Sequence, residues 1–366
     1  MSNNPFLSEV LVHVNPTYEV QDPKPEDVQS YQEAIMVSQE AFNEIESTNA
    51  ALSSLINASM SYHHLKSSME SADIDPALVA TVSKAIGSTV GFEEAVVSLE
   101  GAADVAAKIG KAILDGILFF FKKILSFIGI LRNHSEKELS RTKKVLDKIA
   151  TRTKAEGNVK VKVSLSDAEM RWLHTASNGG PSTHINSDLA RAQNIAVQCI
   201  DEVLGKIEKE GHGLAQINEV AKIHAIRESL AVNNKALKEY VIGDALVHVN
   251  DKGNAYVVTK AEESKGGGKE YEVDLHTAKT VVEEIVKTKK FVVTYGSKLE
   301  SRSNKLESVL KTVAEKAATT HEEQLSSALK SIIDELKGMI VDSVKIVKHV
   351  EETSSHILNI YDRLVH

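Results

Sequence analysis

Apolar residues recur at spacings of three and four along most of the chain, which is the pattern of amphipathic helices. The clearest case lies between residues 322 and 364, where two series of positions follow a seven-residue repeat and are interrupted only by Ser343 and Ser354. This repeat predicts one long helix that packs in a bundle or a coiled coil. The apolar members of the two series are Leu329, Leu336, Val350, Ile357 and Leu364, and Ile333, Ile340, Val347 and Tyr361.

Further helices and a few strands are expected elsewhere. Helical periodicity covers residues 26–71, 75–86, 188–209, 213–240 and the segment after His276. Alternation at period two predicts a strand in VKVKVSL at 159–165, with a helix capped by Ser166 after it, and a hairpin at 244–260. Short strands are also expected at 11–14 and 271–275. Together these patterns predict a mainly α protein with a small β element (α+β), in which helical bundles dominate.

The segment from Gly101 to Leu131 is the most apolar part of the chain. Asp115, Lys122 and Lys123 lie inside it, and charges at such positions oppose a membrane-spanning helix. We expect a buried or interfacial helix here, followed by a separate, strongly basic helix over residues 132–154.

Charge divides the chain at about residue 100. Residues 1–100 contain 15 Asp and Glu but 3 Lys and Arg, a net charge of −12, whereas the whole chain carries 43 − 51 = −8, which leaves +4 for residues 101–366. An acidic segment in front of a basic one is typical of a tail that shields a basic surface, or of a nucleic-acid face. We divide the chain into an acidic helical region (1–100), an apolar and then basic segment (101–155), an α+β region (156–296) and long C-terminal helices (297–366).

Catalytic and metal-binding motifs are absent from the sequence. A single Cys excludes a disulfide framework and cysteine-based zinc clusters, and Cys199 lies in a helical, largely apolar run. The 14 His residues form no HExxH motif, and neither a phosphate-binding loop nor a nucleophile motif is present. We therefore expect no enzyme, no cofactor and no metal. The N-terminus lacks the features of a secretory signal, which indicates synthesis in a cytoplasm.

The tetrapeptide Ser98-Leu99-Glu100-Gly101 lies where the acidic part of the chain meets the basic part. Two weaker matches to Ser-x-Glu followed by a small residue are Ser38 to Glu40 and Ser68 to Glu70. This pattern resembles the recognition site of the prohead proteases of giant tailed phages of the phiKZ type. Their internal head (inner-body) proteins carry an acidic propeptide that is removed during capsid maturation. The helix after the cut, with Phe119 to Phe121 before Lys122 and Lys123, also resembles that family but contains no Trp.

The resemblance implies a structural virion protein that is packaged inside the capsid after proteolysis behind Glu100. Its partners would be the prohead protease, other head proteins and packaged DNA, bound without sequence preference, and its C-terminal helix could mediate oligomerisation. The candidate DNA contacts are Lys122, Lys123, Arg141, Lys143, Lys144 and Lys148.

Two alternatives remain open from the sequence. The first is an unprocessed helical scaffold or interaction protein, or one that lies on a membrane surface through residues 109–131. The second is an enzyme delivered with phage DNA, which would need a site in residues 155–296, where no convergent acid and base set is found.

Overall fold

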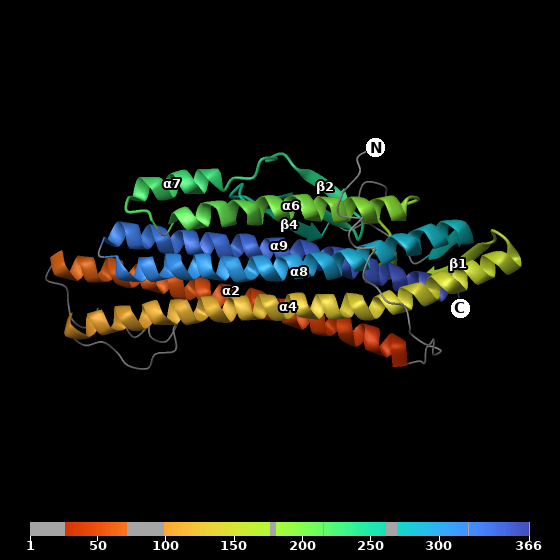
Figure 1. The fold of residues 1–366 in the computed structure, drawn as a ribbon, viewed down its shortest axis with the longest axis horizontal. Coiled ribbons are helices and arrows are strands. Elements are labelled where there is room, and N and C mark those ends of the chain that lie inside the picture. Colours follow the sequence, from red (N-terminus) through yellow and green to blue (C-terminus); the bar gives the residue numbers. More distant parts are fainter. Residues whose placement is uncertain are drawn as a thin grey trace.

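Helices form most of the structure, and two small antiparallel sheets complete it (Figure 1). The computed structural model describes residues 26–71, 99–175, 181–214, 216–260, 269–320 and 322–365. The expected mainly α fold with a small β element is therefore confirmed. The helices of the described residues are α2 (Glu26–Ser71), α4 (Leu99–Glu156), α5 (Asp167–Arg171), α6 (Ile185–Leu214), α7 (Val220–Ser229), α8 (Leu275–Thr319) and α9 (Glu323–Leu364).

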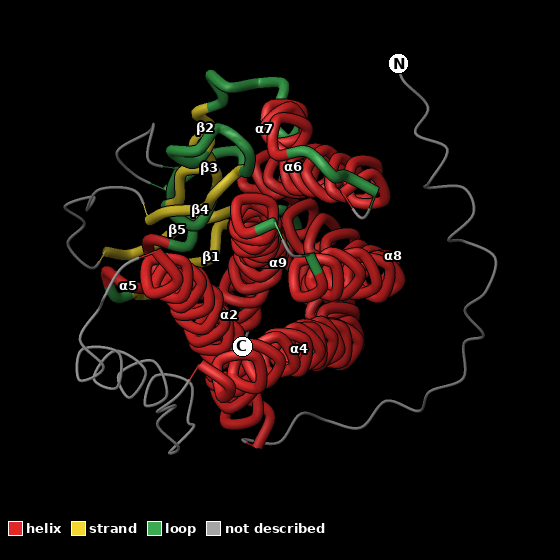
Figure 2. The backbone as a smooth tube through the Cα atoms, turned by 90° about the vertical axis from the view of Figure 1, so that its left-hand side faces the viewer, coloured by secondary structure: helices red, strands yellow, loops and turns green. Residues whose placement is uncertain are grey.

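The C-terminal helix α9 is the centre of the bundle (Figure 2). It contacts α2, α4, α6 and α8, and strand β4 (Tyr256–Lys260) lies against it as well. The two positions that interrupt its heptad pattern, Ser343 and Ser354, are 2% and 0% exposed. Their hydroxyls donate to the carbonyls of Met339 and Glu351 on the same helix, so both serines fit the core without a lost hydrogen bond.

Helix α4 is continuous, which differs from the two helices expected at 101–131 and 132–154. No Pro occurs near Leu131 and Arg132, and the single Gly129 costs the helix only about 1 kcal/mol, which does not end it. Its buried face also continues past this point through Val145 and Ile149, which lie in the core. The change from apolar to basic composition thus reflects the exposed side of one helix and not a boundary between two.

The strands form two sheets, and the strands of one of them lie far apart in the sequence. Strand β1 (Lys160–Leu165) pairs with β5 (Lys269–Asp274), and Lys160 lies opposite Asp274. The expected hairpin is confirmed as β3 (Ala245–Val249) and β4, and its third strand is β2 (Lys238–Val241). Strand β5 ends at Asp274, directly before the start of α8, so its pairing with β1 holds the first residues of that helix in place.

The helix expected over residues 213–240 is confirmed only over α7, at Val220–Ser229. Residues 213 and 214 are the end of α6, residues 216–219 are not helical, and after α7 the chain extends into β2. Asn233 and Asn234, poor helix formers, interrupt the segment. The side chain of Glu202 accepts the backbone N–H of Asn233, which fixes the non-helical path.

Other expectations concern chain ends and boundaries. Ser166 caps α5 as predicted, and Glu169 completes the capping box. Helix α8 runs without a break through residue 296, where we placed a domain boundary. The strand expected at 11–14 and the helix expected at 75–86 lie outside the described residues.

Candidate functional site

A group of charged side chains is buried where α4, α8 and α9 meet. His134 and Glu138 lie one turn apart on α4, Lys289 is on α8, and Glu351 and Ser355 are on α9. Lys289 is 0% exposed and Glu351 is 1% exposed. We call these five residues the ionic cluster.

The cluster is held together by short contacts between opposite charges. The Nζ of Lys289 lies 3.0 Å from Oε1 of Glu351 and also contacts Oε2 of Glu138. Nδ1 of His134 lies 2.6 Å from the same Oε1 of Glu351. The hydroxyl of Ser355 lies within hydrogen-bond distance of both carboxylates. One polar atom of Glu138, Oε1, has no hydrogen-bond partner.

Mutual attraction keeps Lys289 and Glu351 charged despite their burial. Burial alone would raise the pKa of Glu351, but Lys289 and His134 hold that pKa far below its ordinary value. Burial alone would lower the pKa of Lys289, but the carboxylates of Glu138 and Glu351 raise it. Removal of one partner would leave a buried charge uncompensated, which typically costs about 3–5 kcal/mol.

The cluster also gathers groups that could ligate a metal, although no metal was expected from the sequence. One ligand atom from each of His134, Glu138 and Glu351 lies within 4.8 Å of the others. The signal that could have identified the cluster is a charge on an apolar stripe. Lys289 falls four residues after Ile285 and three before Val292, at helical core spacing.

A second candidate site is the interface that α2 makes with α4 and α9. Polar side chains of α2 contact four lysines of the other two helices. Glu44 lies 2.7 Å from Lys123 of α4, and Glu46 lies 3.6 Å from Lys345 of α9. The remaining pairs are Gln39 with Lys348, and Asn49 with Lys337.

Apolar residues of α2 fill the space between these polar contacts. Phe42 packs its ring 5.4 Å from that of Phe127, and the Nζ of Lys348 lies 5.5 Å from the centre of the Phe42 ring. Ile45, Leu52 and Ile56 are buried as well. α2 is therefore an acidic, amphipathic helix seated on a surface that is apolar in the middle and rich in lysine.

The candidate cleavage residues lie in different surroundings. Leu99, Glu100 and Gly101 form the start of α4, directly after the undescribed segment 72–98 that follows α2, and Ser98 lies in that segment. The weaker site at Ser38 and Glu40 is in the middle of α2, where Ser38 is buried, and Ser68 and Glu70 lie in its last turn. A protease needs an extended substrate, so of these sites a helix end is easier to open than a mid-helix site.

The candidate DNA contacts do not form one continuous basic surface. Lys122 and Lys143 are exposed, but 21 residues of helix separate them by about 32 Å. Lys144 and Lys148 are partly buried near Lys143. Arg141 is engaged by Asp362 at 2.7 Å and by Asn359, and Lys123 is engaged by Glu44 as described above.

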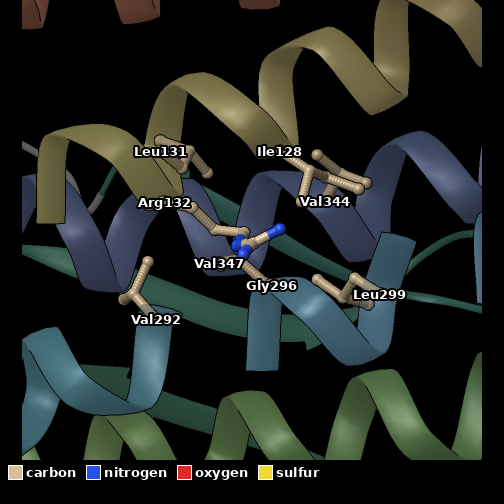
Figure 3. A pocket seen from close by; sticks show the side chains of 8 residues that line it. All are labelled: Ile128, Leu131, Arg132, Val292, Gly296, Leu299, Val344 and Val347. Atoms are coloured by element: carbon tan, nitrogen blue, oxygen red, sulfur yellow. The ribbon is translucent and has the colours of Figure 1, made fainter. Parts of the chain in front are cut away.

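A shallow depression between α4, α8 and α9 offers no ligand site (Figure 3). The side chain of Arg132 crosses it toward α8 and pairs with Glu300 at 2.7 Å. Its passage depends on Gly296, because a Cβ there would lie 2.5 Å from Cγ of Arg132. Arg132 therefore fills the depression and ties α4 to α8.

Comparisons of the chain with family models, with curated proteins and with solved structures gave no match. In the described part of the chain, no helix has an apolar stretch long enough to cross a membrane.

Proposed function

We propose that the chain is a structural protein of a phage head whose acidic N-terminal region is a propeptide removed after Glu100. In this proposal residues 1–100 cover part of the surface of the mature protein until the prohead protease cuts. The mature chain, with a net charge of +4, then contacts other head proteins and the phosphates of packaged DNA.

The observation that carries the proposal is the interface that α2 makes with α4 and α9. Glu44 and Glu46 pair with Lys123 and Lys345, so loss of α2 frees these cations together with the apolar surface beneath Phe42. Charge and fold thus support the same division of the chain, since the acidic segment lies against lysines of the basic one. The resemblance of Ser98 to Gly101 to a prohead-protease site supports the position of the cut.

The test is the intact mass and N-terminal sequence of the protein recovered from mature particles. A chain that begins at Gly101 is the expected result. A full-length chain in mature particles would contradict the propeptide, and the unprocessed scaffold or membrane-surface protein would take its place.

DNA binding is tested separately, with the full-length chain and the processed chain at several salt concentrations. The processed chain should bind more tightly, with an affinity that falls as salt rises. The double variant Lys123→Ser/Lys345→Ser should lower the salt dependence by about two ion equivalents. The matched control, Lys160→Ser/Lys162→Ser, removes the same charge from β1 and should change binding less. Equal binding by full-length and processed chains would contradict the shielding role of α2.

A further inference from the structure

We propose that Lys330 of α9 is a site of reversible modification by carbon dioxide, and that the hydroxyl of Ser327 holds the carbamate that forms on its amine. The proposal rests on the burial of this lysine and on the side chains beside it, and it is independent of the proposed function.

Lys330 differs from the other buried lysines of the described residues. It is 3% exposed, as deeply buried as they are. Lys289, Lys337 and Lys348 each contact a carboxylate. The carboxylate that would ordinarily pair with Lys330 is that of Asp334, four residues later on the same helix. Asp334 instead lies 2.7 Å from Nζ of Lys337, so in the described part of the chain Lys330 keeps no carboxylate of its own.

The missing carboxylate matters because only a neutral amine is a nucleophile. Burial lowers the pKa of Lys330 from 10.5 to about 8. At pH 7.5 about a quarter of such an amine is neutral, against about one part in a thousand for an amine with a pKa of 10.5. Loss of solvent around a lysine is a general way of making its amine nucleophilic.

A hydroxyl without a partner lies one turn away on the same side of α9. Ser327 precedes Lys330 by three residues, a spacing that places both side chains on one face. Oγ of Ser327 is buried and has no hydrogen-bond partner in the described structure, which is costly for a hydroxyl. A carbamate on Nζ of Lys330 would supply two acceptor oxygens, so the hydroxyl would donate to one of them.

Carbon dioxide suits this site by size and by charge. It is small and uncharged, so it enters a buried site from which charged or bulky acylating reagents are excluded. The amine nitrogen forms a bond to the carbon of carbon dioxide, the electron pair of one C=O bond moves to its oxygen, and a proton of the amine passes to solvent. The product is the carbamate anion, and the step needs neither an oxidant nor a cofactor.

The negative charge of the carbamate would lie on the face of α9 that also carries Lys337. Burial lowers the pKa of Lys337 even though Asp334 pairs with it, so one carboxylate does not fully compensate this ammonium. A further negative charge two turns away would stabilise Lys337 in its charged form.

The test uses the full-length wild-type chain in bicarbonate buffer labelled with carbon-13. Carbamates are trapped by O-ethylation with a triethyloxonium salt, and peptide mass spectrometry assigns their positions. At pH 7.5 we expect at least tenfold higher occupancy at Lys330 than at the exposed Lys311, and higher occupancy than at Lys337. Occupancy at Lys330 should rise with pH around a midpoint near 8. The α-amino group of the chain, with an ordinary pKa of about 8, is the positive reference.

A pair of serine variants tests the hydroxyl. Ser327→Ala should lower the occupancy at Lys330 by about threefold or more, because the carbamate loses its donor. The matched control is Ser331→Ala, whose hydroxyl lies one residue after Lys330 and meets Arg227 on another face of the helix, and it should leave the occupancy unchanged. Equal occupancy in Ser327→Ala and the wild-type chain would overturn the role of Ser327.

Two results on the wild-type chain would overturn the proposal, and neither depends on the folding of a variant. One is the absence of label from Lys330 in a sample whose α-amino group is labelled. The other is equal occupancy at Lys330 and Lys311.

Discussion

Release of α2 after a backbone cut is the prediction that tests the docking surface most directly. Four apolar side chains of the described part of α2 are buried: Phe42, Ile45, Leu52 and Ile56. At about 1.5–3 kcal/mol each, their burial contributes roughly 6–12 kcal/mol. Association of two separate chains costs about 4–15 kcal/mol, a range of the same size. The helix should therefore stay in place while it is tethered and leave once the tether is cut.

The assay uses the folded full-length chain with the recognition sequence of a specific protease inserted in residues 72–98. After the cut, size-exclusion chromatography at about 1 μM should separate the two fragments, because the midpoints of the two ranges nearly cancel. Even the most favourable ends, about 12 − 4 = 8 kcal/mol, give a dissociation constant of only about 1 μM. The uncut chain and a chain without the insertion are the controls. Fragments that still co-elute at 1 μM would refute the reasoning, since they would require a docking energy above about 8 kcal/mol.

Three further predictions concern the packing around α9. Gly243→Ala should lower the free energy of unfolding by about 2–5 kcal/mol in urea titrations, because Gly243 has φ of 89° and a Cβ would lie 2.6 Å from Oγ1 of Thr353; Gly253→Ala, with a positive φ but open space around it, should lose less. Burial lowers the pKa of His349 from 6.5 to about 4, so the unfolded chain binds a proton at higher pH than the folded chain does. The free energy of unfolding should therefore decline as the pH falls from 6.5 to 4. His349→Gln should flatten that decline in melting curves, and an unchanged slope would contradict the prediction. In metal-free buffer, Lys289→Met should lower the free energy of unfolding by about 3–5 kcal/mol, because it leaves two buried carboxylates without a cation. The triple variant Glu138→Leu/Lys289→Met/Glu351→Leu should recover most of that loss. A triple variant no more stable than the single one would count against an ionic balance in the core.

The elements that the sequence predicts well are those whose pattern is repeated many times. The heptad series of α9 and the long periodicity of α2 end within a residue or two of the expected positions. Expectations failed where a local pattern was ambiguous. Asn233 and Asn234 lie in a segment of helical composition, and only the contact of Glu202 with the backbone of Asn233 shows that the chain extends there.

The candidate sites are harder to predict because they join residues far apart in the chain. Lys289 and Glu351 each lie on an apolar stripe, which could have identified them singly as buried charges. Their mutual contact, and the contact of both with residues of α4, depends on how three helices align along their axes. The pairing of Glu44 with Lys123 depends on the same alignment, although the charge division of the sequence indicated that acidic and basic segments would meet.

Polar residues on the faces of α9 explain how these long helices find one alignment. A bundle with only apolar contacts can slide by one turn at modest cost, because similar side chains replace one another at heptad positions. Here a slip of α9 would separate Lys337 from Asn49 on one face and Glu351 from Lys289 on another. Glu351 and Lys289 would lose a charge partner, whereas Lys337 would keep the ion pair with Asp334 of its own helix and lose the hydrogen bonds to Asn49. The penalties act on different neighbours at once. These polar contacts add little net stability when they form, but their loss excludes the misaligned packings. They therefore determine both the position of α2 against α9 and the geometry of the ionic cluster.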